Sequence, residues 1–107
     1  MIKKLNIKNL EQREIMPGFH GRFVNGVNIT WAFWEIEKGS SIPDHNHIHE
    51  QIMHVLSGDF SFTINGVSSI FTKGDTIVIP SNTPHRGTAL TDCKIMDVFS
   101  PKREEYI

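Results

Sequence analysis

Four side chains in the middle of the sequence have the residue types and the spacing of a metal-binding site. His45 and His47 are two residues apart, and on an extended backbone such side chains point to the same face and can hold one ion together. Gln51 follows four residues after His47, and His85 follows the turn PSNTP at 80–84, whose two prolines restrict the backbone before it. The pattern predicts a site for one divalent metal ion at His45, His47, Gln51 and His85.

The alternative is that these histidines are ordinary surface residues or hydrogen-bonded core residues. A single histidine in a strand is more often of that kind, and an HxH pair can arise by chance. Six histidines occur in the 107 residues, however, and three of them fall within positions 45–49, which favours a metal site. Zinc, nickel, iron and manganese all accept imidazole, so the ligands alone do not identify the metal.

Short runs rich in β-branched and aromatic residues must position these side chains. We expect strands at 19–24, 27–36, 51–56, 60–64, 68–71, 76–79 and 93–99. Asn25-Gly26 and Asn65-Gly66 each lie between two such runs, and each predicts a tight type I′ hairpin. Residues 1–13 predict a short strand or a single helical turn, and residues 101–107 a charged tail that leaves the sheet. No segment has sustained helical periodicity.

Many short antiparallel strands in a small protein must close into a barrel or pack as two sheets, so the sequence predicts an all-β barrel or jelly roll. A length of 107 residues is typical of one domain. We therefore expect a single domain over residues 1–107, with the metal motifs within 39–58 and 74–89.

Composition and charge exclude several classes of partner. Eleven basic and twelve acidic residues give a net charge of −1, with no block of either sign, which argues against nucleic acid and membrane surfaces as partners. The only cysteine is Cys93, so no internal disulfide can form, as suits a reducing compartment. No apolar run has the length of a signal peptide or a membrane span, and we expect a cytoplasmic protein.

The spacing around these ligands resembles the two sequence motifs of the cupin family. The matching positions are Gly39, His45, His47 and Gly58 in the first motif, and Gly74, Pro80 and His85 in the second. The resemblance implies a double-stranded β-helix, or jelly-roll barrel, over nearly the whole chain. It also selects Gln51 rather than the adjacent Glu50 as the fourth ligand.

Two positions depart from the family pattern. The first motif usually has glutamate where this chain has Gln51, and the second usually has glycine where it has Asn82. Three imidazoles and an amide are neutral, so a bound dication keeps its full charge, whereas a carboxylate partly neutralises it and helps to support a trivalent oxidised state. The glutamine therefore favours Lewis-acid or templating chemistry over oxygen chemistry at iron.

Two further segments, HEQI at 49–52 and DVFSPKRE at 97–104, resemble the small bacterial cupins of the KdgF type. That resemblance implies uronate catabolism from pectin or alginate, in which a cyclic 4,5-unsaturated uronate is converted without oxidation into its open-chain keto form. The substrate is then a small carboxylate sugar, and the implied catalytic residues are Asp97, Phe99 and Arg103. Because cupins of this size commonly pair through their sheets, the resemblance also implies a homodimer.

These three residues suit that role physically. In the expected strand 93–99, Asp97 and Phe99 share one face with Ile95. If that face lines the barrel, Asp97 is a pocket carboxylate that can act as general acid or base, and Phe99 forms a wall against a sugar ring. Arg103 has the planar fork that pairs with a carboxylate. The alternatives are that Asp97 faces solvent, that Phe99 belongs to the core, and that Arg103 is a surface charge.

Two other functions compete with the uronate hypothesis. One is a non-catalytic module that binds a sugar or another small anion. The other is a metal-dependent dioxygenase of the quercetinase kind, against which the neutral ligand Gln51 counts.

Overall fold

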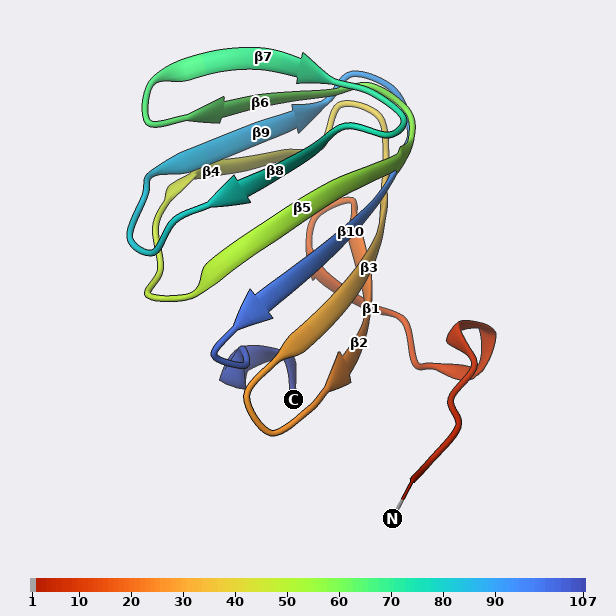
Figure 1. The fold of residues 1–107 in the computed structure, drawn as a ribbon. Helices are drawn as coiled ribbons and strands as arrows, with labels where there is room; N and C mark the ends of the chain where they lie inside the picture. The colour runs from red at the N-terminus through yellow and green to blue at the C-terminus, as the bar shows by residue number, and fades with distance from the viewer. Residues whose placement is uncertain (1) are drawn as a thin grey trace.

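The protein, described by a computed structural model over residues 2–107, consists of two antiparallel sheets whose inner faces pack together (Figure 1). The strands are β1 (Arg13–Met16), β2 (Phe19–Asn25), β3 (Thr30–Ile36), β4 (Ser41–His45), β5 (Glu50–Ser57), β6 (Phe60–Ile64), β7 (Val67–Phe71), β8 (Thr76–Ile79), β9 (His85–Ala89) and β10 (Cys93–Ser100). One sheet has the order β1-β2-β3-β10-β5-β8 and the other β4-β9-β6-β7. Short 3-10 turns, η1 (Ile7–Asn9) and η2 (Glu104–Tyr106), lie near the two termini. The predicted all-β jelly roll is confirmed.

Alternation of buried and exposed side chains along β3, β5 and β10 defines the inner face of the six-stranded sheet. In β10 every odd-numbered residue from Cys93 to Phe99 is buried, and the residues between them are more exposed. Side chains at alternate strand positions point to opposite faces of a sheet, so the inner face of β10 contributes to both the core and any pocket inside the barrel. Phe60 and Phe62 of β6 complete the core from the opposite sheet.

The two Asn-Gly pairs behave differently. Asn65 and Gly66 have φ angles of 50° and 81° and join β6 directly to β7, as predicted for a type I′ turn. The prediction for Asn25-Gly26 is wrong, because β3 begins only at Thr30 and four residues form the loop. The Asn25 side chain accepts a hydrogen bond of 2.6 Å from the Thr30 hydroxyl and so closes the loop. The backbone of Asn25 does not adopt the positive φ of a type I′ turn.

Three strands and the end of the chain depart from the sequence expectation. β1, β4 and β9 were not predicted, whereas η1 supplies the single turn expected before residue 13; Met1 lies outside the described residues. The segment after β10 is not a free tail, because it folds back and Tyr106 packs against the core. The Arg13 guanidinium donates to the Tyr106 carbonyl at 2.9 Å and thereby holds the end of the chain against β1. Within residues 2–107 no helix has the length and apolar character needed to cross a membrane.

Gly58 and Gly74 provide a matched test of the turns that frame the barrel. Both have a left-handed backbone, with φ of +89° and +92°. A Cβ at position 58 would lie 2.2 Å from the Asp92 carbonyl oxygen, whereas nothing lies within 4 Å of a Cβ at position 74. We expect Gly74→Ala to cost about 1–2 kcal/mol from the left-handed backbone alone, and Gly58→Ala about 1–3 kcal/mol more from overpacking. Urea unfolding measures both values, and equal losses would contradict the steric argument.

Candidate metal centre

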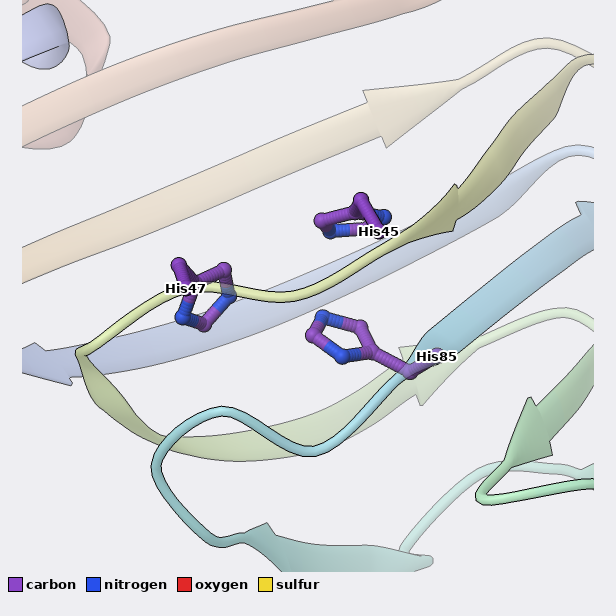
Figure 2. A group of neighbouring side chains, drawn as sticks. All are labelled: His45, His47 and His85. Atoms are coloured by element: carbon purple, nitrogen blue, oxygen red, sulfur yellow. The ribbon is translucent and has the colours of Figure 1, made fainter.

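Three histidine rings converge inside the barrel, although one of them comes from a distant part of the sequence (Figure 2). His45 ends β4 and His85 begins β9, and antiparallel pairing of these strands places the two residues directly opposite each other. His47 lies in the loop that follows β4. One nitrogen from each ring lies within 4.8 Å of those of the others. Strand pairing and the HxH spacing thus bring together the three histidines predicted from the sequence.

Hydrogen bonds to the backbone fix the orientation of all three rings. The Nδ1 atoms of His45, His47 and His85 lie 2.8, 2.9 and 2.8 Å from the carbonyl oxygens of residues 43, 49 and 83, respectively. Because a carbonyl can only accept, each Nδ1 carries the proton and each Nε2 keeps a free lone pair. Metal-binding histidines have this arrangement, in which the ring nitrogen away from the metal donates to a carbonyl.

Burial keeps the inner rings neutral. Burial, helped by the nearby positive charge of Arg103, lowers the pKa of His47 to about 4. Burial likewise lowers the pKa of His85. A neutral imidazole is the form that binds a cation, because protonation removes the lone pair.

Gln51 has a buried side-chain oxygen and lines a pocket together with two of the histidines. It lies on the inner face of β5, is 6% exposed, and lines a pocket with His45 and His85. Its Nε2 donates to Asp97 Oδ1 at 2.9 Å, whereas its Oε1 is buried and has no hydrogen-bond partner among the described residues. Glu50 is exposed on the outer face of the same strand, so of the two residues only Gln51 lies on the inner face.

The residues present fit a divalent cation. Both Gln51 Oε1 and His47 Nε2 are buried acceptors without a partner among residues 2–107, and such atoms are costly unless something satisfies them. Three imidazole nitrogens and one amide oxygen form a neutral donor set of the kind that zinc, nickel and iron accept. This group can hold one metal ion.

The turn between β8 and β9 is hydrogen-bonded to the loop that carries His47. Asn82 has a left-handed backbone with φ of 61°, and its N–H donates to the His47 carbonyl at 2.7 Å. The Ser81 hydroxyl donates to the Ile48 carbonyl at 2.6 Å. Asparagine is one of the few residues besides glycine that enter this backbone region readily. The conformation explains why asparagine can replace the usual glycine of the second motif.

Asp97 is buried in the same pocket as the histidine cluster and does not face solvent. It is 7% exposed, and its two oxygens accept one donor each, Gln51 Nε2 at 2.9 Å and Trp34 Nε1 at 3.0 Å. Burial raises the pKa of Asp97 to about 7, and the hydrogen bonds from Gln51 and Trp34 oppose the rise. A carboxyl group with such a pKa can hold or release a proton near neutral pH.

Phe99 and Arg103 form one wall of the same pocket. Phe99 is 3% exposed and belongs to the core as well as to the pocket. The Arg103 guanidinium lies 4.7 Å from the Phe99 ring centre and 4.8 Å from that of Tyr106, and it pairs with Glu105. Its side chain is 13% exposed. Arg103 therefore packs against two adjacent aromatic rings and lines the pocket.

Trp34 and Tyr106 also line this pocket and were not singled out from the sequence. The hydrogen bond from Trp34 to Asp97 was not predicted. In β3, Trp34 lies on the same face as Ala32 and on the face opposite Trp31 and Phe33. This alternation could have indicated that Trp34 points into the barrel. Tyr106 lies in a segment without strand or helix pattern, and no signal in the sequence places it in the pocket.

The remaining histidines lie around or away from the cluster. His49 packs beside Phe99, and its Nδ1 is buried without a hydrogen-bond partner among residues 2–107. His54 faces outward from β5, with Nδ1 2.5 Å from the Thr76 hydroxyl. His20 lies 2.8 Å from Glu37 on another part of the six-stranded sheet.

Solved structures of several bacterial proteins share this fold. KdgF from Halomonas sp. superposes with a TM-score of 0.93 at 24% identity, over 100% of both chains. An RmlC-like cupin from Shewanella frigidimarina superposes with a TM-score of 0.90 at 26% identity, covering 94% of this chain and 91% of the other. The polyketide cyclase RemF from Streptomyces resistomycificus has a TM-score of 0.82 at 20% identity, covering 97% and 82%.

Sequence comparisons agree with the structural ones. An uncharacterized protein of Streptomyces coelicolor is 21% identical over 102 residues, which span 94% of this chain and 97% of the other. Residues 32–99 match the cupin domain family, and this range contains the three histidines, Gln51, Asp97 and Phe99. With its jelly-roll fold and its histidine cluster, the chain belongs to the cupin family and resembles KdgF.

Proposed function

We propose that this cupin binds one divalent metal ion and promotes the non-oxidative opening of a cyclic 4,5-unsaturated uronate to its open-chain keto form. The observation that carries the proposal is the content of one pocket, where a neutral metal-binding set, a buried carboxyl group and an arginine lie on a mostly apolar wall. The neutral set favours Lewis-acid over oxidative chemistry. The resemblance to KdgF-type cupins supplies the substrate class.

Arg103 binds the carboxylate of the uronate in this proposal. A guanidinium presents two parallel N–H donors that match the two oxygens of a carboxylate. Packing against the adjacent rings of Phe99 and Tyr106 restricts its motion, so less side-chain freedom is lost when the substrate binds. Phe99 also gives the sugar ring an apolar wall.

Asp97 moves the proton during the reaction. Its carboxylate accepts the proton of the C1 hydroxyl as the bond between C1 and the ring oxygen breaks, which leaves an aldehyde at C1 and an enolate at C4–C5. Asp97 then delivers the same proton to C4, which converts the enolate into the C5 ketone and restores the carboxylate, so atoms and charge balance without a redox partner. When bound, the metal ion acts as a Lewis acid that polarises a substrate oxygen. Gln51 and the three histidines would hold it.

Metal binding is tested first. We expect His85→Ala to abolish tight binding of Zn²⁺, because it removes one of three convergent imidazoles. Saturating metal at 100 times its Kd should stabilise the wild-type protein by about 2.7 kcal/mol and raise Tm on the order of 10 °C. Calorimetry with metal-stripped protein lacking a histidine tag measures both effects.

The matched control is His54→Ala, because His54 faces away from the cluster. It should bind Zn²⁺ as the wild type does. An unchanged affinity in His85→Ala, or an equal loss in both variants, would show that the cluster is not the metal site.

Activity is tested with the unsaturated product of a pectate or alginate lyase. Metal-loaded wild-type protein should accelerate the loss of absorbance of the conjugated double bond. Arg103→Lys keeps the charge but loses the planar fork, and we expect kcat/KM to fall by about 10–100-fold, as removal of one charged hydrogen bond predicts. The fall should appear mainly in KM.

Arg86→Lys is the control for the activity test, because Arg86 is exposed on β9 and should leave kcat/KM unchanged. Decay at the spontaneous rate with wild-type protein would overturn the enzymatic proposal. Tight binding of the uronate without turnover would favour a binding module, and oxygen uptake with an aromatic substrate would favour a dioxygenase.

We also propose that two copies of the chain pair through the outer face of the six-stranded sheet. Strand register aligns a continuous row of apolar residues across that face: Val24, Trp31, Val98, Ile52 and Val78. Ile52 is 43% and Val78 53% exposed, and contiguous exposed apolar surface of this kind marks interaction sites. A second copy presents the same row and is self-complementary about a two-fold axis.

Light scattering after size-exclusion chromatography tests the dimer. Ile52→Lys places a charge in the middle of the row and should convert a dimer into a monomer. Val67→Lys, on the exposed strand β7 of the other sheet, should leave the dimer intact. A monomeric wild type would contradict the proposal.

A further inference from the structure

Trp34, Asp97 and Gln51 form a buried chain of hydrogen bonds across three adjacent strands. They lie on β3, β10 and β5, and each is 7% exposed or less. The Trp34 indole N–H donates to one Asp97 oxygen at 3.0 Å, and the Gln51 amide donates to the other at 2.9 Å. Each oxygen of the carboxylate therefore has its own donor.

These hydrogen bonds determine which end of the Gln51 amide faces the histidines. The oxygen and nitrogen of a glutamine side chain are similar in size, and only their hydrogen-bond partners distinguish them. An ionised carboxylate accepts only, so it takes the –NH₂ group of Gln51 and leaves Oε1 facing the other way. Gln51 Oε1 is buried and has no partner among residues 2–107.

Trp34 makes this choice specific. An indole N–H is a donor only, and it occupies Asp97 Oδ2, so the other oxygen is left for Gln51. We propose that Asp97 and Trp34 are positioning residues that orient the Gln51 amide so that its oxygen faces the three imidazoles. The inference rests on the metal site of the proposed function.

The same series of hydrogen bonds explains why this cupin has glutamine at the position of the usual glutamate. A glutamate at position 51 would place a second carboxylate at hydrogen-bond distance from Asp97, and like charges so close are unfavourable. An acid at 97 and an amide at 51 are therefore a matched pair. Exchanging the two groups, with Asn at 97 and Glu at 51, should preserve the match.

The first test uses the metal-free protein. The side-chain –NH₂ protons of Gln51 and the indole N–H of Trp34 should be protected from exchange with water in NMR spectra of the wild type. Asp97→Asn should remove the protection of at least one donor, because an amide offers one acceptor to two donors. Gln51 protons that exchange as freely as those of a surface amide would overturn the inference.

The second test measures Co²⁺ binding by competition with a chelator and by visible absorption, which reports coordination. In Asp97→Asn the amide at 97 bonds to Trp34 through its oxygen and turns its –NH₂ toward Gln51, so Gln51 presents nitrogen to the cluster. We expect Co²⁺ affinity to fall by about 10–100-fold, the range typical when a residue that hydrogen-bonds to a metal ligand is mutated. Adding Gln51→Glu to Asp97→Asn should restore affinity to the wild-type value or better.

A buried control separates positioning from loss of packing. Val55 is fully buried on β5 and takes no part in the hydrogen bonds between Trp34, Asp97 and Gln51. Val55→Ala should therefore lower Tm and leave Co²⁺ affinity and absorption unchanged. Trp34→Phe, which keeps an aromatic ring but removes the donor, should weaken Co²⁺ binding. Wild-type affinity in Asp97→Asn, or no rescue by Gln51→Glu, would overturn the inference. Failure of the wild type to bind Co²⁺ would overturn the proposed function, and NMR would still decide the amide orientation.

Discussion

The pairing register of β10 is the constraint on which the core and the pocket both depend. β10 lies between β3 and β5, and its register places Asp97 opposite Ala32 on one side and Met53 on the other. This alignment brings Trp34 and Gln51 within reach of the two oxygens of Asp97. A slip of one residue would turn every inward side chain of β10 outward, so the apolar core and the polar chain would be lost together. Formation of the barrel and assembly of the site are one process.

The pocket concentrates polar groups where the fold would otherwise place apolar ones. His47 Nε2 and Gln51 Oε1 lack partners among residues 2–107, and each such atom destabilises a folded protein by about 1–3 kcal/mol. The surrounding core, which includes Phe60, Phe62 and Phe99, stabilises the barrel in spite of this cost. The arrangement favours ligand binding over maximal stability, as is common where a site is built into a core.

Sequence reasoning predicted features that depend on local pattern and missed those that depend on pairing. The HxH spacing was enough to predict that His45 and His47 act together, and the alternation along 93–99 put Asp97 on one face with Ile95 and Phe99. His85 was added to the site from the proline turn before it and its resemblance to the second cupin motif. β4 and β9 were missed because HRGTA and SIPDH lack the alternation of apolar residues, and their strand geometry comes from pairing with each other. The position of Arg103 could not be predicted, because it depends on contacts of the last residues with Thr30 and Phe99.

Asn82 shows how the second motif is better described. What the fold needs at that position is a backbone with positive φ whose N–H reaches the loop of His47, and both glycine and asparagine supply it. A search for distant members of this group should therefore score the position by the backbone conformation it allows. Chains with asparagine there would otherwise be passed over, although their histidines are held in the same way.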